Sequence, residues 1–313
     1  MDYEKIVLVT RKTRLEALIE RFNTRGQAKF YLEHSGGDYA WYEQEHETYY
    51  TALEGLQKSL SRLAKTQVIE RSFLPNFLFT DSDLVVTAGI DGLVVNTAKY
   101  LSGQPLVAVN PDPTHIDGIL LPFSLSQASQ AVRRVLSGQA KYRLISMAEV
   151  RLNDGQLLLA FNDLFVGARS HVSARYTIQA AGEHEKHSSS GIIISTGAGS
   201  TGWLSSLFNM ANGILETFGG LPAEHNPPLP PLRLDWEAER LVFIVREPFV
   251  SKTSSAKLVC GLITPENPII IHSEMPEGGA IFSDGIESDY LPFNTGSVAT
   301  IGLSQRKTRL VVD

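Results

Sequence analysis

An aspartate between two glycines follows an apolar run near residue 90 and has the surroundings of a group that acts on a hydroxyl. The run at 84–88 (LVVTA) leads into Gly89, Ile90, Asp91 and Gly92. Glycine lets the backbone turn tightly and approach a ligand closely. An acid at a strand end can take a proton from a hydroxyl or organise a metal and phosphates. The alternative is a structural turn in which Asp91 caps the next helix.

A second glycine-rich segment runs from 195 to 203 (STGAGSTGW) after the β-branched run at 192–194. It lacks the lysine of a P-loop. A strand, a small-residue loop and a helix in this order present free N–H groups that suit phosphate or ribose oxygens. The alternative is that Ser200 or Thr201 only caps the helix.

An amide and a carboxylate, Asn162 and Asp163, follow the expected strand at 157–161. Together they offer donors and acceptors for vicinal hydroxyls. The alternative is an Asx turn, which the same residue types favour.

The elements that must position Asp91 alternate between strand and helix. This alternation predicts an α/β domain with a parallel sheet. We expect an irregular insert at 26–44. The expected strands are 5–10, 67–71, 83–87 and 105–110, and the expected helices are 13–25, 45–63 and 94–101.

After about residue 122 the pattern changes to many short strands, which predicts a β-sandwich. Asn153, Asp154 and Gly155 predict a hairpin turn, and one helix is expected at 200–217. We therefore expect two domains, 1–122 and 123–313. The expected strands are 142–145, 148–152, 157–162, 173–179, 241–245, 256–262, 268–273, 280–283, 298–303 and 308–312.

Composition limits the class of protein. The chain has 313 residues, 43% of them hydrophobic, and a net charge of −6. This charge predicts no broad nucleic-acid-binding face, and no apolar run is long enough to cross a membrane. The single cysteine, Cys260, cannot form an intrachain disulfide, which favours a reducing compartment. The start lacks the pattern of a signal peptide. We expect a cytoplasmic protein with no dedicated metal site.

The order of the three segments resembles that of the NAD kinase family, whose signatures are GGDGT, an Asn-Glu pair and a PTGSTAY-type loop. This chain has AGIDGL at 88–93, ND at 162–163 and STGAGSTGW at 195–203. Six further segments look most like the mitochondrial-type branch of the family. They are TRKTR at 10–14, NPDP at 110–113 with GILLP at 118–122, SSG at 189–191, REP at 246–248 and SDG at 283–285.

The resemblance implies an N-terminal α/β domain related to phosphofructokinases and lipid kinases, followed by a β-sandwich domain. It implies transfer of the ATP γ-phosphate to the 2′-hydroxyl of the adenosine ribose of NAD, giving NADP. Mg²⁺ would arrive with ATP, and the protein would form a homodimer or homotetramer.

The resemblance also assigns roles to residues. Asp91 would be the general base, and Gly89 and Gly92 would shape the loop near the phosphates. The residues implied to bind NAD are Asn162, Asp163, Thr196, Gly199, Ser200, Thr201, Gly202, Trp203 and Asp284.

Three positions depart from the family pattern. Ile90 replaces a glycine, and a positive φ there would make isoleucine costly. Leu93 replaces a threonine and removes a hydroxyl, and Asp163 replaces glutamate. Two alternatives therefore stay open: a related kinase acting on a sugar or lipid hydroxyl, and a non-catalytic nucleotide-binding regulator.

Overall fold

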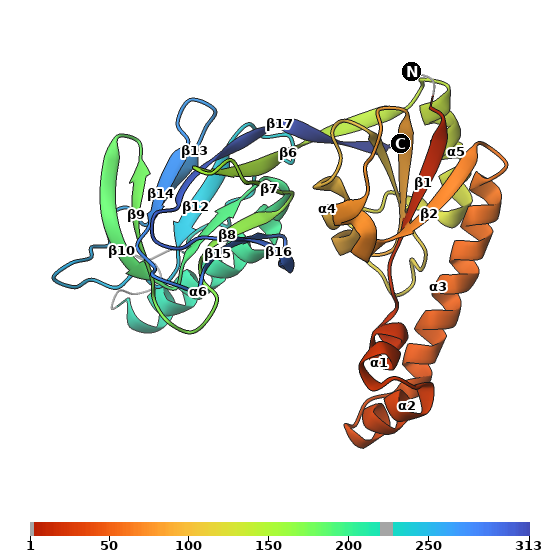
Figure 1. Cartoon of the computed structure of the whole chain (residues 1–313), viewed down its shortest axis with the longest axis horizontal. Helices are drawn as coiled ribbons and strands as arrows, with labels where there is room; N and C mark the ends of the chain where they lie inside the picture. Colours follow the sequence, from red (N-terminus) through yellow and green to blue (C-terminus); the bar gives the residue numbers. More distant parts are fainter. Residues whose placement is uncertain (1–2, 220–227) are drawn as a thin grey trace. The chain divides into compact units, whose positions relative to one another are not determined.

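The computed structural model describes residues 3–219 and 228–313 (Figure 1). Its chain divides into two compact units. The N-terminal unit contains the chain up to Arg143 together with Thr308–Asp313, and the C-terminal unit is Leu144–Lys307. Each unit has its own hydrophobic core.

The boundary between the units lies after Arg143, not at 122 as the change of pattern predicts. The reason is helix α5 (Leu125–Leu136), which is absent from the helices predicted from the sequence. Its buried residues, including Ala128 and Val132, belong to the core of the N-terminal unit.

A parallel sheet forms the centre of the N-terminal unit, and this confirms the predicted α/β fold. Its strands run in the order β2 (Lys65–Glu70), β1 (Lys5–Thr10), β3 (Asp83–Ala88) and β4 (Pro105–Asn110). Both β3 and β4 are buried along their whole length. Strands covered on both faces read as continuous apolar runs, which is why the sequence reveals them.

Two further segments pair with β4 in parallel. One is the short strand β5 (Phe123–Ser124). The other is the end of β17 (Val298–Val312), where Arg309 and Leu310 pair with Pro105 and Leu106. Residues distant in sequence therefore complete this sheet.

The prediction of an irregular insert at 26–44 is wrong, because most of this segment is helical. Helix α2 (Arg25–His34) begins after Thr24, whose hydroxyl accepts the N–H of Gln27. Helix α3 (Tyr39–Leu60) begins after Asp38, whose carboxylate accepts two N–H groups. The other helices of this unit are α1 (Arg14–Phe22), the 3-10 turn η1 (Arg71–Asn76) and α4 (Asp91–Ala98).

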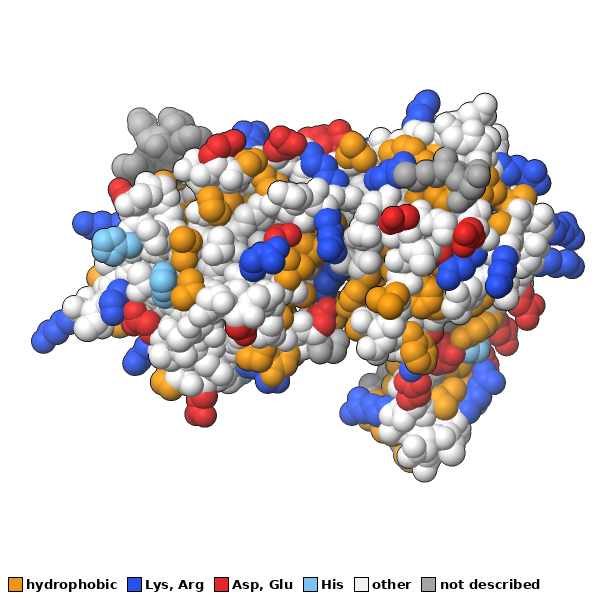
Figure 2. Space-filling view, turned by 45° about the horizontal axis from the view of Figure 1, so that its top comes forward, with side chains coloured by type: hydrophobic (Ala, Val, Ile, Leu, Met, Phe, Trp, Pro, Cys, Tyr) orange, Lys and Arg blue, Asp and Glu red, His pale blue; other side chains and the backbone are white. Residues whose placement is uncertain are grey.

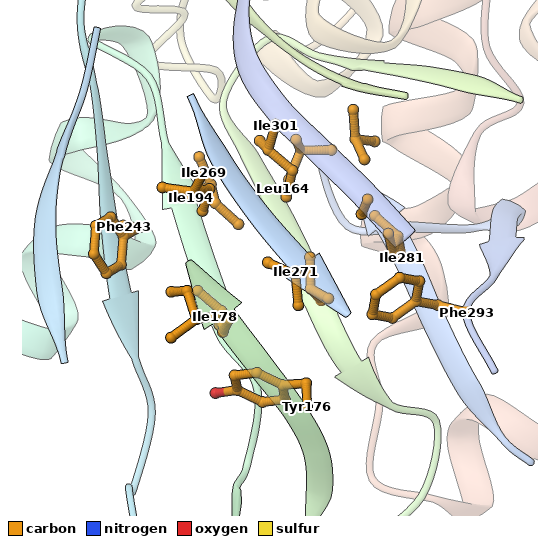
Figure 3. Close-up of a cluster of buried hydrophobic side chains, with 14 of the residues drawn as sticks. Leu164, Tyr176, Ile178, Ile194, Phe243, Ile269, Ile271, Ile281, Phe293 and Ile301 are labelled. Carbon is orange, nitrogen blue, oxygen red and sulfur yellow. The ribbon is translucent and has the colours of Figure 1, made fainter. Parts of the chain in front are cut away.

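Two antiparallel sheets enclose the core of the C-terminal unit, which confirms the predicted β-sandwich. Figure 3 shows side chains of both sheets in this core, among them Ile178, Ile194, Phe243 and Ile271. One sheet contains β10 (Glu183–Ser189), β9 (Ala174–Ala180), β14 (Ile269–Ser273), β17, β6 (Lys141–Leu152) and β7 (Leu157–Ala160). The second contains β13 (Cys260–Ile263), β12 (Leu241–Val245), β11 (Ile192–Ser195), β8 (Asp163–Ala168), β15 (Gly279–Ser283) and β16 (Ile286–Pro292).

One long helix, α6 (Trp203–Phe218), follows the 3-10 turn η2 (Ala198–Thr201) in the C-terminal unit. Leu204 of this helix packs with Leu234 and Val242 in a small cluster. The glycine-rich loop between β11 and α6 is therefore fixed at both ends by packed elements.

Charges of both signs are interspersed on the face seen in Figure 2, and the net charge is −6. Within residues 3–219 and 228–313, no helix has the length and apolar character needed to cross a membrane. Any attraction of an anion would therefore come from local basic groups rather than from the overall charge.

Candidate functional site

The Asp91 carboxylate is held in place by backbone donors. Its two oxygens accept the N–H groups of Leu120 at 2.8 Å and Ile119 at 3.3 Å. These donors follow Gly118, which has φ +64°, and a Cβ there would lie 2.7 Å from Asn110 Nδ2. A carboxylate has about four acceptor sites, so Asp91 keeps capacity for a hydroxyl proton.

Ile90 is the residue before helix α4, with φ −102° and ψ 166°. These are ordinary extended angles, so the strain considered for isoleucine at this position does not arise. Asp91 is itself the first residue of α4, which begins three residues earlier than expected. An acid in the first helical turn interacts favourably with the helix dipole.

Close packing explains Gly89 and Leu93. The Leu93 side chain is fully buried, and a Cβ at Gly89 would lie 2.9 Å from it and 3.5 Å from Arg11 Cδ. Leu93 thus contributes to packing under the loop. At Gly92 a Cβ would meet only Ile90, at 3.9 Å.

In the C-terminal unit, Thr196 joins the glycine-rich loop to the start of β8. Its hydroxyl donates to the Phe161 carbonyl at 2.6 Å and accepts the Gly199 N–H at 3.2 Å. Its own N–H donates to the Asn162 carbonyl at 2.9 Å. A Cβ at Gly199 would lie 2.3 Å from that same carbonyl oxygen, so only glycine fits this approach.

Asp284 fixes the backbone of the Asn162-Asp163 pair. Its carboxylate accepts three backbone N–H groups, from Asn162 at 2.7 Å, Phe161 at 3.0 Å and Asp163 at 3.1 Å. The N–H of Asp284 donates back to the Asp163 carbonyl at 2.9 Å. Asp284 has φ +55°, a left-handed conformation that aspartate tolerates better than most residues. We infer that Asp284 positions the pair.

Replacing Asp284 with alanine is expected to destabilise the C-terminal unit by about 2–3 kcal/mol, because three backbone donors lose a charged acceptor. Asp284→Asn keeps one acceptor oxygen and tolerates the left-handed backbone, so its loss should be smaller. Chemical denaturation measures the stability, and hydrogen exchange measures the protection of the amides of residues 161–163. Unchanged protection of these amides in the alanine variant would contradict this role.

The Asp163 side chain is half-buried, and its buried Oδ1 has no hydrogen-bond partner among the described residues. Burial, together with the negative charge of Asp284, raises the pKa of Asp163 to about 7, although a hydrogen bond from Ser195 opposes the shift. Near neutral pH this side chain can therefore donate a hydrogen bond as well as accept one.

The remaining predicted residues of the loop do not all join this cluster. Ser200 is buried, donates to the Gly197 carbonyl at 2.7 Å and accepts the Leu234 N–H at 3.2 Å. Thr201 is exposed. The residue before α6 is Gly202, with no side-chain cap, so capping by Ser200 or Thr201 is wrong.

Trp203 lies against another aromatic ring. Its centroid is 5.9 Å from that of Phe165 with an interplanar angle of 11°, and the Arg246 guanidinium lies 5.5 Å from the Trp203 ring. The predicted residues thus form two groups: Gly89, Asp91 and Gly92 in the N-terminal unit, and the others in the C-terminal unit.

Sequence reasoning missed a pocket of about 160 Å³ in the N-terminal unit. Ile90 lines it together with Arg11, which follows β1, Arg14, the first residue of α1, and Trp41 of α3. The basic run TRKTR was noticed only as part of a resemblance. Its place directly after a buried strand was the signal that points to the pocket.

No protein-family model matches the chain. Among curated proteins, it is 32% identical over 141 residues to an NAD kinase of Prosthecochloris aestuarii, covering 43% of this chain and 48% of that protein. It is 35% identical over 97 residues to an NAD kinase of Thiobacillus denitrificans, covering 29% and 32%. An NAD kinase of Heliobacterium modesticaldum is 31% identical over 129 residues, with coverage of 39% and 44%. The matched regions span less than half the length of these relatives.

Solved structures resemble the chain over nearly its whole length. Yeast NADH kinase complexed with NADH has a TM-score of 0.59 and 15% identity, covering 100% of this chain and 84% of that one. An NAD kinase from Archaeoglobus fulgidus in complex with ATP has a TM-score of 0.56 and 16% identity, covering 97% and 92%. This chain therefore has the fold of NAD and NADH kinases.

Proposed function

We propose that this protein transfers the γ-phosphate of ATP to the 2′-hydroxyl of the adenosine ribose of NAD, giving NADP. The observation that carries the proposal is the Asp91 carboxylate, which two backbone N–H groups orient while leaving acceptor capacity. The curated relatives are NAD kinases, and the fold is that of solved NAD and NADH kinases. Both findings support the same reaction.

Asp91 would accept the proton of the attacking hydroxyl and orient its oxygen toward the phosphorus. A carboxylate is a weak base. It suffices when the proton leaves late, as in the loose transition state of phosphoryl transfer. Most of the catalytic effect would then come from positioning the two substrates.

Asn162 and Asp163 would bind ribose hydroxyls of NAD, with Asp284 holding their backbone. Thr196, Gly199, Ser200, Thr201, Gly202 and Trp203 belong to the same proposed NAD-binding segment. Of these, Thr196 and Gly199 are supported by their hydrogen bonds to each other and to the 161–162 backbone.

Mg²⁺ would enter with the phosphates of ATP and neutralise their charge during transfer. This ion takes many of its ligands from phosphates and water. The described part of the chain contains no group of three or more His, Cys, Asp or Glu side chains placed to hold a metal.

The test is to incubate the purified full chain with Mg²⁺, ATP and either NAD or NADH, and to measure the phosphorylated product by a dehydrogenase-coupled reaction. We expect NADP from NAD. Binding of NAD without formation of product would instead favour a non-catalytic regulator. The backbone at Ile90 is unstrained, so this position no longer favours that alternative.

A cytoplasmic location and a homodimer or homotetramer belong to the same proposal.

A further inference from the structure

The pocket in the N-terminal unit lies where parallel strands end. Its lining comes from the segments after β1, β3 and β4 and from helix α3. In open α/β sheets, ligands bind outside the carboxyl ends of the strands. The lining residues are Arg11, Arg14, Trp41, Glu45, Tyr49, Ile90, Pro111, Asp112, His115 and Ile116.

Several contacts hold Arg11 in the lining of this pocket. Its side chain is only 11% exposed and its guanidinium lies 4.9 Å from the centre of the Tyr49 ring. The Tyr49 hydroxyl accepts the Arg11 backbone N–H at 3.0 Å and donates to the Ala88 carbonyl at 3.0 Å. It thereby ties the end of β1 to the end of β3.

One N–H of Arg11 has no hydrogen-bond partner within residues 3–219 and 228–313. Its Nε is buried without a hydrogen bond, whereas its other nitrogens donate to Glu45 and to the Lys12 carbonyl. An unpaired buried donor in a charged group is uncommon and calls for an explanation. A bound acceptor at this position would supply one.

Arg14 supplies the second guanidinium. Its side chain is 58% exposed, and its guanidinium lies 4.6 Å from the centre of the Trp41 ring. Stacking on an aromatic face restrains the guanidinium and leaves its edge free for hydrogen bonds. Its ion pair with Glu45 is long, at 3.8 Å.

The two arginines of this pocket have one carboxylate between them. Both contact the single carboxylate of Glu45, Arg11 at 2.9 Å and Arg14 at 3.8 Å. The other acid of the pocket, Asp112, pairs with His115 at 2.8 Å. Within the described part of the chain, the two guanidinium groups therefore share the one carboxylate of Glu45.

We propose that this pocket binds the phosphate chain of the phosphoryl donor through Arg11 and Arg14. Guanidinium groups bind phosphate oxygens in pairs of parallel hydrogen bonds, with stronger contacts than neutral donors make. The assignment of this phosphate chain to the phosphoryl donor rests on the proposed function. The same chemistry fits a nucleoside triphosphate and inorganic polyphosphate, and the experiment separates them.

The test uses isothermal titration calorimetry on the full chain without NAD, with MgATP, tripolyphosphate and adenosine as separate ligands. Arg14→Gln should weaken binding of MgATP and tripolyphosphate about tenfold. The matched control is Arg25→Gln, since Arg25 is 53% exposed, is ion-paired with Glu43 and lies outside the pocket lining. Its affinity for both ligands should equal that of the parent.

The ligands distinguish the sources of phosphate and the two proposals. Arg14-dependent binding of MgATP but not of tripolyphosphate identifies a nucleotide as the ligand, and binding of both identifies the phosphate chain alone as sufficient. Equal binding of MgATP by the parent and Arg14→Gln would overturn the site, even if the parent makes NADP. Conversely, Arg14-dependent binding by a parent that makes no NADP would uphold the site and overturn the proposed function.

Discussion

Replacing Asp91 with asparagine is expected to lower the rate of NADP formation at least about 100-fold, the usual effect of losing a general base. The amide cannot take the hydroxyl proton, yet its oxygen can still accept the Leu120 N–H, the shorter of the two contacts. The fold should therefore persist. Steady-state kinetics should place the loss in kcat rather than in the KM for NAD, because the proposed role of Asp91 is to accept the proton of the attacking hydroxyl.

The control is Asp117→Asn, which removes the same charge from an exposed position in the neighbouring loop. Its kcat should match that of the parent. Circular dichroism and thermal unfolding check that both variants are folded. An Asp91→Asn variant with the parent's kcat would exclude the role of this carboxylate in the reaction.

Asp163 is expected to make the stability of the C-terminal unit fall as pH rises from about 4 to about 7. The pKa of Asp163 is about 7 in the folded protein, against about 4 in an unfolded chain. The folded state therefore binds this proton more tightly. The contribution is fully present below the unfolded pKa and is lost as pH rises through the folded pKa.

The shift corresponds to a contribution of about 4 kcal/mol over this pH range. Asp163→Asn cannot ionise, so its unfolding free energy should vary less between pH 5 and 8, as urea denaturation at several pH values would measure. Asp154→Asn is the control, because hydrogen bonds from Gln156 lower the pKa of that exposed carboxylate. The unfolding free energy of this variant should still fall as pH rises. Parallel curves for the parent and Asp163→Asn would contradict the prediction.

The sequence predicts an element well where a single local pattern determines it. Strands β3 and β4 are buried along their length, so uninterrupted apolar runs reveal them. Strand β10 has the sequence EHEKHSS, with two buried residues in seven, and no apolar pattern marks it. Helix α2 buries only Ala28 and Leu32, too few positions to show a helical period.

The same distinction applies to the candidate site. Asp91 stands out because glycines flank it in the sequence. The role of Asp284 cannot be read from neighbouring residues, because its carboxylate accepts hydrogen bonds from residues more than 120 positions earlier in the chain. Arg14 and Trp41 meet only because α1 and α3 pack together, which no short motif encodes.

The pairing of β17 with β4 has a consequence for the order of events during synthesis. Leu310 and Val311 are buried in the N-terminal unit, and Leu310 pairs with Leu106 of β4. During synthesis, the sheet whose strand β3 leads to Asp91 cannot be completed until the residues that follow the sandwich have been made. Until then one edge of β4 is open to pairing with other chains, so translation that stalls before residue 308 would leave an aggregation-prone intermediate.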